Sequence, residues 1–430
     1  MIPLLLAILP ASAVQSPLSR PLEPYDLRGY PYFGSIVGRA GDVDGDGMPD
    51  IVVGDRASSH EGSPPMIWVL SGKDGRVLRR TPLPVDRSQP TGFQDFALDG
   101  GVDLDGDHVP DLALAVRTSD PGYAATLWIL SGSSGEIRAS RAIRTHGHSS
   151  SGWLRIVQDR NGDSMCDLAV LDPGHEERHA AIVFYSGSSG EPIRTLPFEN
   201  IGATSVGSFL EVPARGSKSP ASFAVLLETD EDGRVAPRST LELLSDQGSR
   251  VWQRPWPRGQ YGTNAVLALL AGTDFVAAHE NTVDVVRDAS AEARLHFVAK
   301  SEEGEGFGCS LASPGDLDRD GAPDLVYGIY DPGLYEGAVV ARSGKDGRQL
   351  WRVEGDFGEN VHHLGYRIGV VGDLDGDGAA DLVLGTMEGP DGTAHGLAQV
   401  VSGRDGSLLF LFRRQLDSVF VEHHPVNKLR

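Results

Sequence analysis

The amino-acid sequence predicts an all-β fold, a seven-bladed β-propeller of four-stranded blades. Two patterns that recur together predict this fold. A nine-residue acidic motif begins at residues 42, 103, 159, 316 and 373, and each copy is followed by an apolar strand that ends in a Ser-Gly turn. Self-similarity at a fixed period of about 50 to 60 residues is typical of solenoids and propellers, in which each repeat is one structural unit.

The number of repeat units follows from the copies of the Ser-Gly turn. Its copies read VLSGKDG (69–75), ILSGSSG (129–135), FYSGSSG (184–190), ARSGKDG (341–347) and VVSGRDG (400–406). The third and fourth acidic motifs begin 157 residues apart, close to three periods, and LLSDQG (243–248) and VVRDAS (285–290) stand where two further turns are expected. The sequence therefore predicts seven units, of which the fourth and fifth have lost the acidic motif.

Each unit is expected to hold four short strands. In the first unit these are residues 35–40, 51–55, 66–71 and 77–80, with the acidic motif between the first two and the hairpin turn between the last two. Four-stranded units repeated in this way fit a propeller, whose radial packing leaves only short sheet edges. We expect the propeller to span residues 30–415, followed by a C-terminal tail at 416–430.

Composition and charge agree with this interpretation. The chain has 430 residues with 54 Gly and 27 Pro, which favours short strands joined by tight turns. It has 60 acidic against 38 basic residues, a formal net charge of −22. Binding to nucleic acid or to an anionic membrane surface is therefore disfavoured, whereas binding of cations is favoured.

The acidic motif, D-x-D-x-D-x-x-x-D, has the spacing of a calcium loop. Side chains at positions one, three and five of a tight loop can converge on one point, and the carbonyl at position seven and the aspartate at position nine complete an oxygen cage. About five Ca²⁺ sites are predicted. Their ligands are Asp42, Asp44, Asp46, Met48, Asp50; Asp103, Asp105, Asp107, Val109, Asp111; Asp159, Asn161, Asp163, Met165, Asp167; Asp316, Asp318, Asp320, Ala322, Asp324; and Asp373, Asp375, Asp377, Ala379, Asp381.

Two alternatives to calcium stay open at this point. The motifs could be solvated acidic turns without an ion, or Mg²⁺ could bind, although Mg²⁺ prefers to keep its water ligands. Recurrence of the motif five times in register favours an ion in each copy. The acidic run at 230–233 follows the second strand of its unit, the wrong place for this loop, so we expect no ion in units four and five.

The N-terminus predicts export from the cell. Residues 2–9 are an apolar run, and Ala11-Ser12-Ala13 is a small-residue cleavage site, so residues 1–13 are expected to be a signal peptide followed by a lead-in at 14–29. The remaining chain has no apolar stretch of the length that a membrane span needs. The only cysteines, Cys166 and Cys309, lie in different units and are expected to be free thiols. A secreted, periplasmic or extracellular location is predicted.

The motifs resemble those of a known family. Phe33-Gly34 before GDVDGDGMPDIVVG, Phe307-Gly308 before GDLDRDGAPDLVYG and Gly365 before GDLDGDGAADLVLG are similar to FG-GAP repeats, the propeller repeat of integrin α subunits. The resemblance covers about residues 30–415, although units two and three alter the Phe-Gly step. It implies a seven-bladed propeller with Ca²⁺ between the first and second strands, and a role in adhesion or ligand recognition.

No motif points firmly to catalysis. His175-Glu176-Glu177-Arg178-His179 matches the H-E-x-x-H pattern of zinc proteases, but it occupies a short loop between strands where no helix can place both histidines on one face. We therefore expect a non-catalytic module with no catalytic residues. Two alternatives are kept, a polysaccharide lyase and a lectin. A cluster of Lys, Arg or His in the central funnel would favour the lyase, and shallow pockets with aromatic floors would favour the lectin.

The loops between second and third strands vary most and lie on the face opposite the calcium loops. Recognition tends to lie in variable loops on a rigid scaffold. Candidate contacts to an extracellular protein or glycan ligand are Tyr123, His175, Tyr330, Tyr335 and His395. The expected partner is that ligand alone, with the chain acting as a monomer.

Overall fold

The structure, a computed structural model, describes most of the strands and the short turns between them. The described residues are 33–55, 65–84, 95–117, 124–145, 153–172, 180–198, 205–212, 222–229, 238–256, 266–271, 274–279, 282–287, 293–298, 306–330, 337–355, 363–386, 396–415 and 418–424. The expected signal peptide at 1–13 and the lead-in at 14–29 lie outside them.

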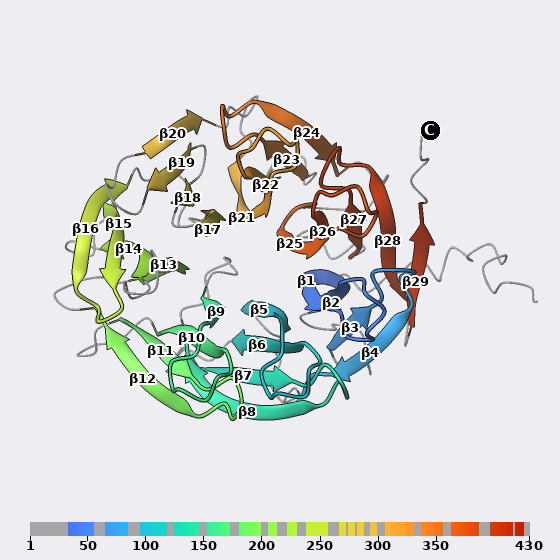
Figure 1. Cartoon of the computed structure of the whole chain (residues 1–430), viewed down its shortest axis with the longest axis horizontal. Helices are drawn as coiled ribbons and strands as arrows, with labels where there is room; N and C mark the ends of the chain where they lie inside the picture. The colour runs from blue at the N-terminus through green and yellow to red at the C-terminus, as the bar shows by residue number, and fades with distance from the viewer. Residues whose placement is uncertain are drawn as a thin grey trace, which may run out of the picture.

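The described strands form seven antiparallel sheets in chain order, arranged as a ring (Figure 1). The first three sheets comprise β1 (Phe33–Gly41), β2 (Asp50–Asp55), β3 (Met66–Leu70) and β4 (Val77–Pro82); β5 (Asp95–Val102), β6 (Asp111–Arg117), β7 (Ala124–Leu130) and β8 (Ile137–Arg144); and β9 (Leu154–Val157), β10 (Asp167–Asp172), β11 (Ala181–Tyr185) and β12 (Pro192–Pro197). In the first sheet, all four predicted strands are confirmed to within about two residues.

The next two sheets are the units that lost the acidic motif. They comprise β13 (Ser205–Val212), β14 (Ser222–Thr229), β15 (Arg238–Ser245) and β16 (Arg250–Trp256); and β17 (Val266–Ala271), β18 (Asp274–His279), β19 (Thr282–Arg287) and β20 (Ala293–Val298). Their apolar residues still form a packed sheet without the acidic loop. Phe223 and Leu241, for example, are fully buried.

The last two sheets are unequal. One has four strands, β21 (Gly306–Gly315), β22 (Asp324–Tyr330), β23 (Ala338–Arg342) and β24 (Gln349–Glu354). The other has five, β25 (Arg367–Gly372), β26 (Asp381–Gly385), β27 (Ala398–Val401), β28 (Leu408–Gln415) and β29 (Ser418–His423). Six sheets are thus the four-stranded blades that the sequence predicts, and the sheet β25–β29 departs from that prediction.

The fifth strand comes from the segment predicted as a C-terminal tail, residues 416–430. β29 pairs antiparallel with β28, whose outer edge would otherwise be open. Val419 and Val421 pack against the apolar cluster shared by the first and last sheets. A Cβ atom added to Gly75 in the first sheet would lie only 2.5 Å from Val421 Cγ1. The added strand therefore covers the junction where the ring closes.

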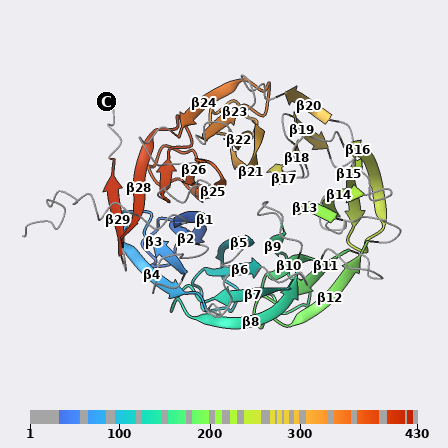
Figure 2. The same cartoon turned by 180° about the vertical axis from the view of Figure 1, so that it is seen from behind.

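The innermost strand of each sheet faces the centre of the ring, which both views show (Figures 1 and 2). β1 contacts β5 on one side and β25 on the other, so the first and last sheets are neighbours. The core lies between sheets rather than at the centre. One cluster joins Phe33 and Trp68 of the first sheet to Val383 and Phe412 of the last. No helix in the described part of the chain is long and apolar enough to cross a membrane.

Candidate functional site

The five acidic loops share one backbone conformation. Position six of each loop donates its N–H to the carboxylate of position one, as Gly47 does to Asp42 (2.9 Å) and Ser164 to Asp159 (2.8 Å). Positions four and six have positive φ in every copy, including the non-glycine residues His108 (68°), Ser164 (70°) and Arg319 (63°). The glycines that dominate these positions in the sequence are there because L-residues rarely adopt this conformation.

Position five closes the second half of the loop. Its carboxylate accepts the N–H of position seven in all five copies, at 2.7 to 2.9 Å. The predicted position-seven residues therefore lie beside position five. The acceptor and donor pairs are Asp46 with Met48, Asp107 with Val109, Asp163 with Met165, Asp320 with Ala322, and Asp377 with Ala379.

The aspartate at position nine also accepts backbone hydrogen bonds that the motif does not predict. These aspartates open the second strand and are completely buried. One oxygen of Asp50 accepts the N–H of Val43 at loop position two (2.7 Å), and the other accepts the N–H of Gly72 in the Ser-Gly turn (3.0 Å). Asp111, Asp167, Asp324 and Asp381 make the same two bonds in their own sheets. Each buried carboxylate therefore joins the loop to the hairpin turn.

This bridge explains why the turn contains glycine. A Cβ atom on Gly72 would lie 1.9 Å from the carbonyl oxygen of Pro49, and the turn glycines of the other four acidic units meet an equivalent oxygen at 1.8 to 2.1 Å. Only glycine lets the turn approach closely enough for its N–H to reach the carboxylate. The sequence signal for this contact was the recurrence of a Ser-Gly turn 20 to 22 residues after position nine of each acidic motif.

Burial raises the pKa of the position-nine carboxyls. The pKa is raised to about 6 for Asp50 and Asp324 and to about 7 for Asp381. Desolvation is the largest cause, the two backbone N–H donors oppose it, and the neighbouring loop carboxylates raise the pKa further. Ionising these groups is therefore costly unless a positive charge lies close by.

Four loops bring three carboxylates close enough to share a cation. In each set, one oxygen from every residue lies within 4.8 Å of the others. Oxygens on opposite sides of one Ca²⁺ are about 5 Å apart, so these sets fit a hard cation with oxygen ligands. The sets are Asp42, Asp44 and Asp50; Asp103, Asp105 and Asp111; Asp316, Asp318 and Asp320; and Asp373, Asp375 and Asp381. The loop at Asp159 has Asn161 at position three and so offers one carboxylate fewer.

The residue after each Ser-Gly pair also contacts the loop, which sequence reasoning missed. Lys73 Nζ lies 3.6 Å from a carboxylate oxygen of Asp46, and Arg404 Nε donates to Asp377 Oδ2 at 2.9 Å. In two other units, Ser133 and Ser188 donate their hydroxyls to Asp107 and Asp163. The turn thus supplies hydrogen-bond donors, and in places a positive charge, to position five of its own loop.

One loop residue holds neighbouring sheets together. Leu104, Leu317 and Leu374 at position two pack against the turn glycine of the next sheet, because a Cβ atom there would lie 2.8 to 3.0 Å from a leucine methyl carbon. In the third unit this residue is Arg160. The facing residue of the fourth sheet is Asp246 instead of glycine, and the two side chains pair at 2.6 Å.

The guanidinium group of Arg160 lies among acidic and aromatic side chains. It also pairs with Glu211 and lies 5.6 Å and 5.5 Å from the ring centroids of Phe184 and Phe223. The fourth unit therefore exchanges a leucine–glycine contact for an ion pair at the border where the acidic motif is lost.

The residues predicted to contact an extracellular ligand cannot be assembled into a site from the described part of the chain. Tyr123, His175, Tyr335 and His395 lie outside the described residues, and so does the H-E-x-x-H stretch at 175–179. Tyr330 ends β22, but its side chain is outside the description. The variable loops that carry these residues therefore add nothing to the geometry of the site.

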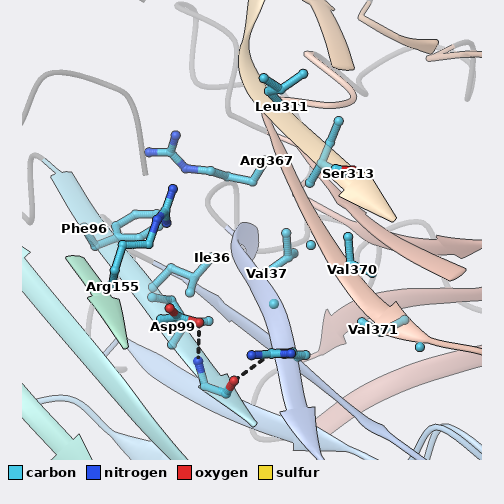
Figure 3. A pocket seen from close by; sticks show the side chains of 17 residues that line it. Ile36, Val37, Phe96, Asp99, Arg155, Leu311, Ser313, Arg367, Val370 and Val371 are labelled. Carbon is cyan, nitrogen blue, oxygen red and sulfur yellow. Dashed lines mark hydrogen bonds between the residues drawn. The ribbon is translucent and has the colours of Figure 1, made fainter. Parts of the chain in front are cut away.

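The described residues also line an open cavity of about 420 Å³ between the innermost strands of five sheets (Figure 3). Innermost strands β1, β5, β9, β21 and β25 supply its walls. Its lining contains three arginines, Arg39, Arg155 and Arg367, and one carboxylate, Asp99. This basic cluster in the funnel is the feature that the sequence could not establish.

Comparisons with known proteins give partial similarities. No protein-family model matches the chain. Phosphatidylinositol-glycan-specific phospholipase D of Bos taurus is 30% identical over 168 residues, which is 34% of this chain and 20% of that protein. Integrin alpha-PS2 of Drosophila melanogaster is 34% identical over 95 residues, 20% of this chain and 7% of that protein. Rhamnogalacturonan endolyase YesW of Bacillus subtilis is 29% identical over 193 residues, 41% of this chain and 28% of that protein.

The chain thus spans less than a third of each of these relatives. The solved structure of the Dos1 propeller aligns with 92% of this chain at a TM-score of 0.49 and 11% identity. The chain is an all-β propeller with distant similarity to integrin alpha chains and to a rhamnogalacturonan endolyase.

Proposed function

We propose that this chain is a secreted, calcium-stabilised propeller that recognises an extracellular protein or glycan ligand without catalysis. The observation that carries the proposal is the set of four loops in which three carboxylates share one small volume. A divalent cation would convert their mutual repulsion into attraction and hold the loop in one conformation.

The geometry of the loop fits Ca²⁺. In three of the four sets, positions one, three and nine would supply the carboxylate oxygens, and in the loop at Asp316 position five takes the place of position nine. Both oxygens of Asp50 already accept an N–H, but a carboxylate has about four lone-pair sites and can accept more partners. A bound ion would therefore join the loop, the second strand and the Ser-Gly turn at one point.

Elemental analysis and thermal unfolding test the calcium part. We expect the folded protein to carry about four or five equivalents of calcium, and a chelator to lower the melting temperature markedly. Adding Ca²⁺ back should restore it, whereas Mg²⁺ at the same concentration should restore it only in part. Absence of bound alkaline-earth metal, together with an unchanged melt in chelator, would contradict this part of the proposal.

Recognition is supported by the architecture. Acidic loops and hairpin turns share one face of the ring, as the bond between Asp50 and Gly72 requires, and the variable loops leave the opposite ends of the strands. Glycan and extracellular-protein arrays, probed with calcium and with chelator, test it. We expect a calcium-dependent hit that is lost when the variable loop at 387–395 is replaced by a short Gly-Ser linker.

A second candidate is a polysaccharide lyase. The basic cluster in the central cavity favours it, because a lyase acting on an acidic polysaccharide needs positive charge beside the substrate carboxylate. Similarity to a rhamnogalacturonan endolyase gives further support. Incubation with acidic polysaccharides, followed by ultraviolet absorbance of unsaturated product, separates the two candidates. Release of product that requires Arg155 or Arg367 would replace the first candidate with the second.

A further inference from the structure

The acidic loops of the last two sheets are joined to each other directly. These are the loop at Asp316, between β21 and β22, and the loop at Asp373, between β25 and β26. Their sheets are neighbours in the ring, where β21 contacts β25. Arg319 Nη2 in the first loop donates to the main-chain carbonyl oxygen of Asp377 in the second. The two loops therefore meet at position five of the second loop.

A second arginine reaches the same carbonyl oxygen. Arg404 follows the Ser-Gly pair of the last sheet, and its Nη2 donates to the carbonyl oxygen of Asp377 at 2.7 Å. Its Nε donates to the carboxylate of the same residue at 2.9 Å, and its Nη1 donates to the carbonyl oxygen of Leu317 in the other loop at 3.5 Å. Arg319 and Arg404 thus hold Asp377 from both sheets.

Arg319 adopts a backbone conformation that is costly for its residue type. Its φ is 63°, in the left-handed region that L-residues rarely adopt. Strain of this kind persists only where the surroundings impose it, and it clusters at functional sites. Glycine would satisfy the turn without strain, so the turn alone does not explain an arginine here. Position four of the other four loops is Gly45, Gly106, Gly162 and Gly376.

The candidate cation site of the first loop includes both neighbours of Arg319. The convergent carboxylates are those of Asp316, Asp318 and Asp320, at positions one, three and five, whereas the other three sets use position nine in place of position five. A cation held by Asp318 and Asp320 would restrict the backbone of Arg319 between them. Binding in this loop would therefore help to direct the guanidinium toward Asp377.

The peptide unit that accepts the arginines also supports the second candidate site. It contains the carbonyl oxygen of Asp377 and the N–H of Gly378, which donates to the carboxylate of Asp373 at 2.9 Å. Because the peptide unit is planar, holding its carbonyl also fixes the direction of its N–H. The N–H of Asp377 donates to Asp373 at 3.1 Å and to Asp375 at 3.0 Å. Two of the three carboxylates in this set thus depend on the placement of Asp377.

We propose that the loops at Asp316 and Asp373 bind divalent cations cooperatively, with Arg319 as the positioning residue that couples them. The inference rests on the calcium sites proposed above. A cation in the first loop would order Arg319 on the carbonyl of Asp377, so the second loop would lose less conformational entropy when its own ion binds. Because such coupling is reciprocal, an ion in the second loop raises the affinity of the first by the same factor.

A double-mutant cycle in calcium binding tests the proposal. Asp318→Asn and Asp375→Asn each remove the charge at position three of one loop. Each asparagine keeps a side-chain oxygen to accept the N–H of position five, as the aspartate does at 3.0 Å. Titration against a chromophoric chelator gives the product of the calcium affinities for the unaltered protein, the two single variants and the double variant.

Cooperative loops should give losses that do not multiply. Each single variant loses one site and the coupling, whereas the double variant loses both sites but the coupling only once. The product of the two single losses should therefore exceed the loss in the double variant by a coupling factor of at least about fivefold. A factor of about one would overturn the proposal.

Replacing the linking residue shows whether Arg319 carries the coupling. Arg319→Gly places at position four the residue of the other loops and relieves the positive φ, so the variant should fold. In this background we expect the coupling factor to fall to about one. The matched control is His108→Gly, which also removes a non-glycine residue at positive φ (68°) from an acidic loop but has a side chain that is 95% exposed. The control should keep the coupling factor, and a factor that survives in Arg319→Gly would contradict the assigned role.

Failure of this proposal is distinguishable from failure of the calcium proposal. A protein that binds no calcium would contradict both. A protein that binds four or five equivalents, with losses that multiply independently, would retain the calcium sites and contradict only the coupling between the two loops.

Discussion

Asp55 and Arg414 are 359 positions apart in the chain and form a buried ion pair between the first and last sheets. Their side chains are 0% and 1% exposed. Asp55 also accepts the N–H of Met66 at 2.6 Å, and the guanidinium of Arg414 lies 5.8 Å from the ring centroid of Trp68. Together with β29, this pair fixes the junction at which the ring closes.

Removing one partner of this ion pair should strongly lower the free energy of unfolding. We expect Asp55→Ala to lower the free energy of unfolding by about 3–5 kcal/mol, because it leaves the Arg414 charge buried without its counterion. The matched control is Arg141→Ala, which breaks an exposed pair with Glu191 and should cost no more than about 1 kcal/mol. Urea unfolding followed by circular dichroism measures both, and equal losses would show that the pair does not hold the junction.

Positions three and nine of a loop should respond differently to calcium. Asp50→Ala removes a carboxylate that accepts two backbone N–H groups, so we expect a loss of about 2–5 kcal/mol with calcium and a substantial loss in chelator as well. Asp44→Ala removes a carboxylate that pairs with the exposed Arg76 and accepts one N–H, from Asp46 at 3.2 Å, so most of its loss should appear only when calcium is present. Melting curves of both variants, recorded in calcium and in chelator, measure these losses. A calcium-independent loss for Asp44→Ala would contradict the assigned roles.

Stability in chelator should fall as pH rises. Because folding raises the pKa of Asp381 from its ordinary value of 3.8 to about 7, the native state holds this proton more tightly than the unfolded chain does. Its stabilising contribution is present below pH 4 and is lost as pH rises toward 7. Calcium should weaken or reverse this trend, because a bound ion favours the ionised carboxylate.

Melting temperatures measured between pH 5 and pH 8 test this dependence. The control is Asp381→Asn, which cannot titrate and should show a shallower slope in chelator than the unaltered protein. Repulsion among the other carboxylates acts in both proteins, so the difference between their slopes isolates Asp381. Identical slopes would mean that this group does not titrate in the measured range.

At the border between the third and fourth sheets, a change at Asp246 should destabilise the protein less when Arg160 is changed with it. Asp246→Gly restores the residue found at this place in the five acidic units but removes a carboxylate that pairs with both Arg160 and Arg194, so we expect a loss of about 2–4 kcal/mol. Adding Arg160→Leu recreates the leucine–glycine contact seen at Leu104 and Gly187 and should recover much of that loss. A double-mutant cycle measures the coupling. Simple additivity of the two changes would show that they do not interact.

The sequence by itself determined the strand order, the repeat and the carboxylate loops. These features are local: apolar alternation every second residue specifies a half-buried strand, and the spacing of Asp42, Asp44 and Asp46 specifies a tight loop whatever surrounds it. The same logic located the two degenerate units, since their strands kept the apolar pattern after the aspartates were gone. The candidate ligands of the acidic loops therefore follow from short stretches of sequence alone.

Only the tertiary structure decided how distant segments meet. The added strand β29, the pairing of Asp55 with Arg414 and the placement of Arg155 and Arg367 at one end of the cavity all depend on closure of the ring. An arginine on an innermost strand has the same local sequence context as one on the surface. Strand alternation predicts which face of the sheet a side chain lies on, but it does not predict which residues of other sheets the side chain contacts. Contacts over hundreds of residues follow from the packing of sheets, which no short stretch of sequence encodes.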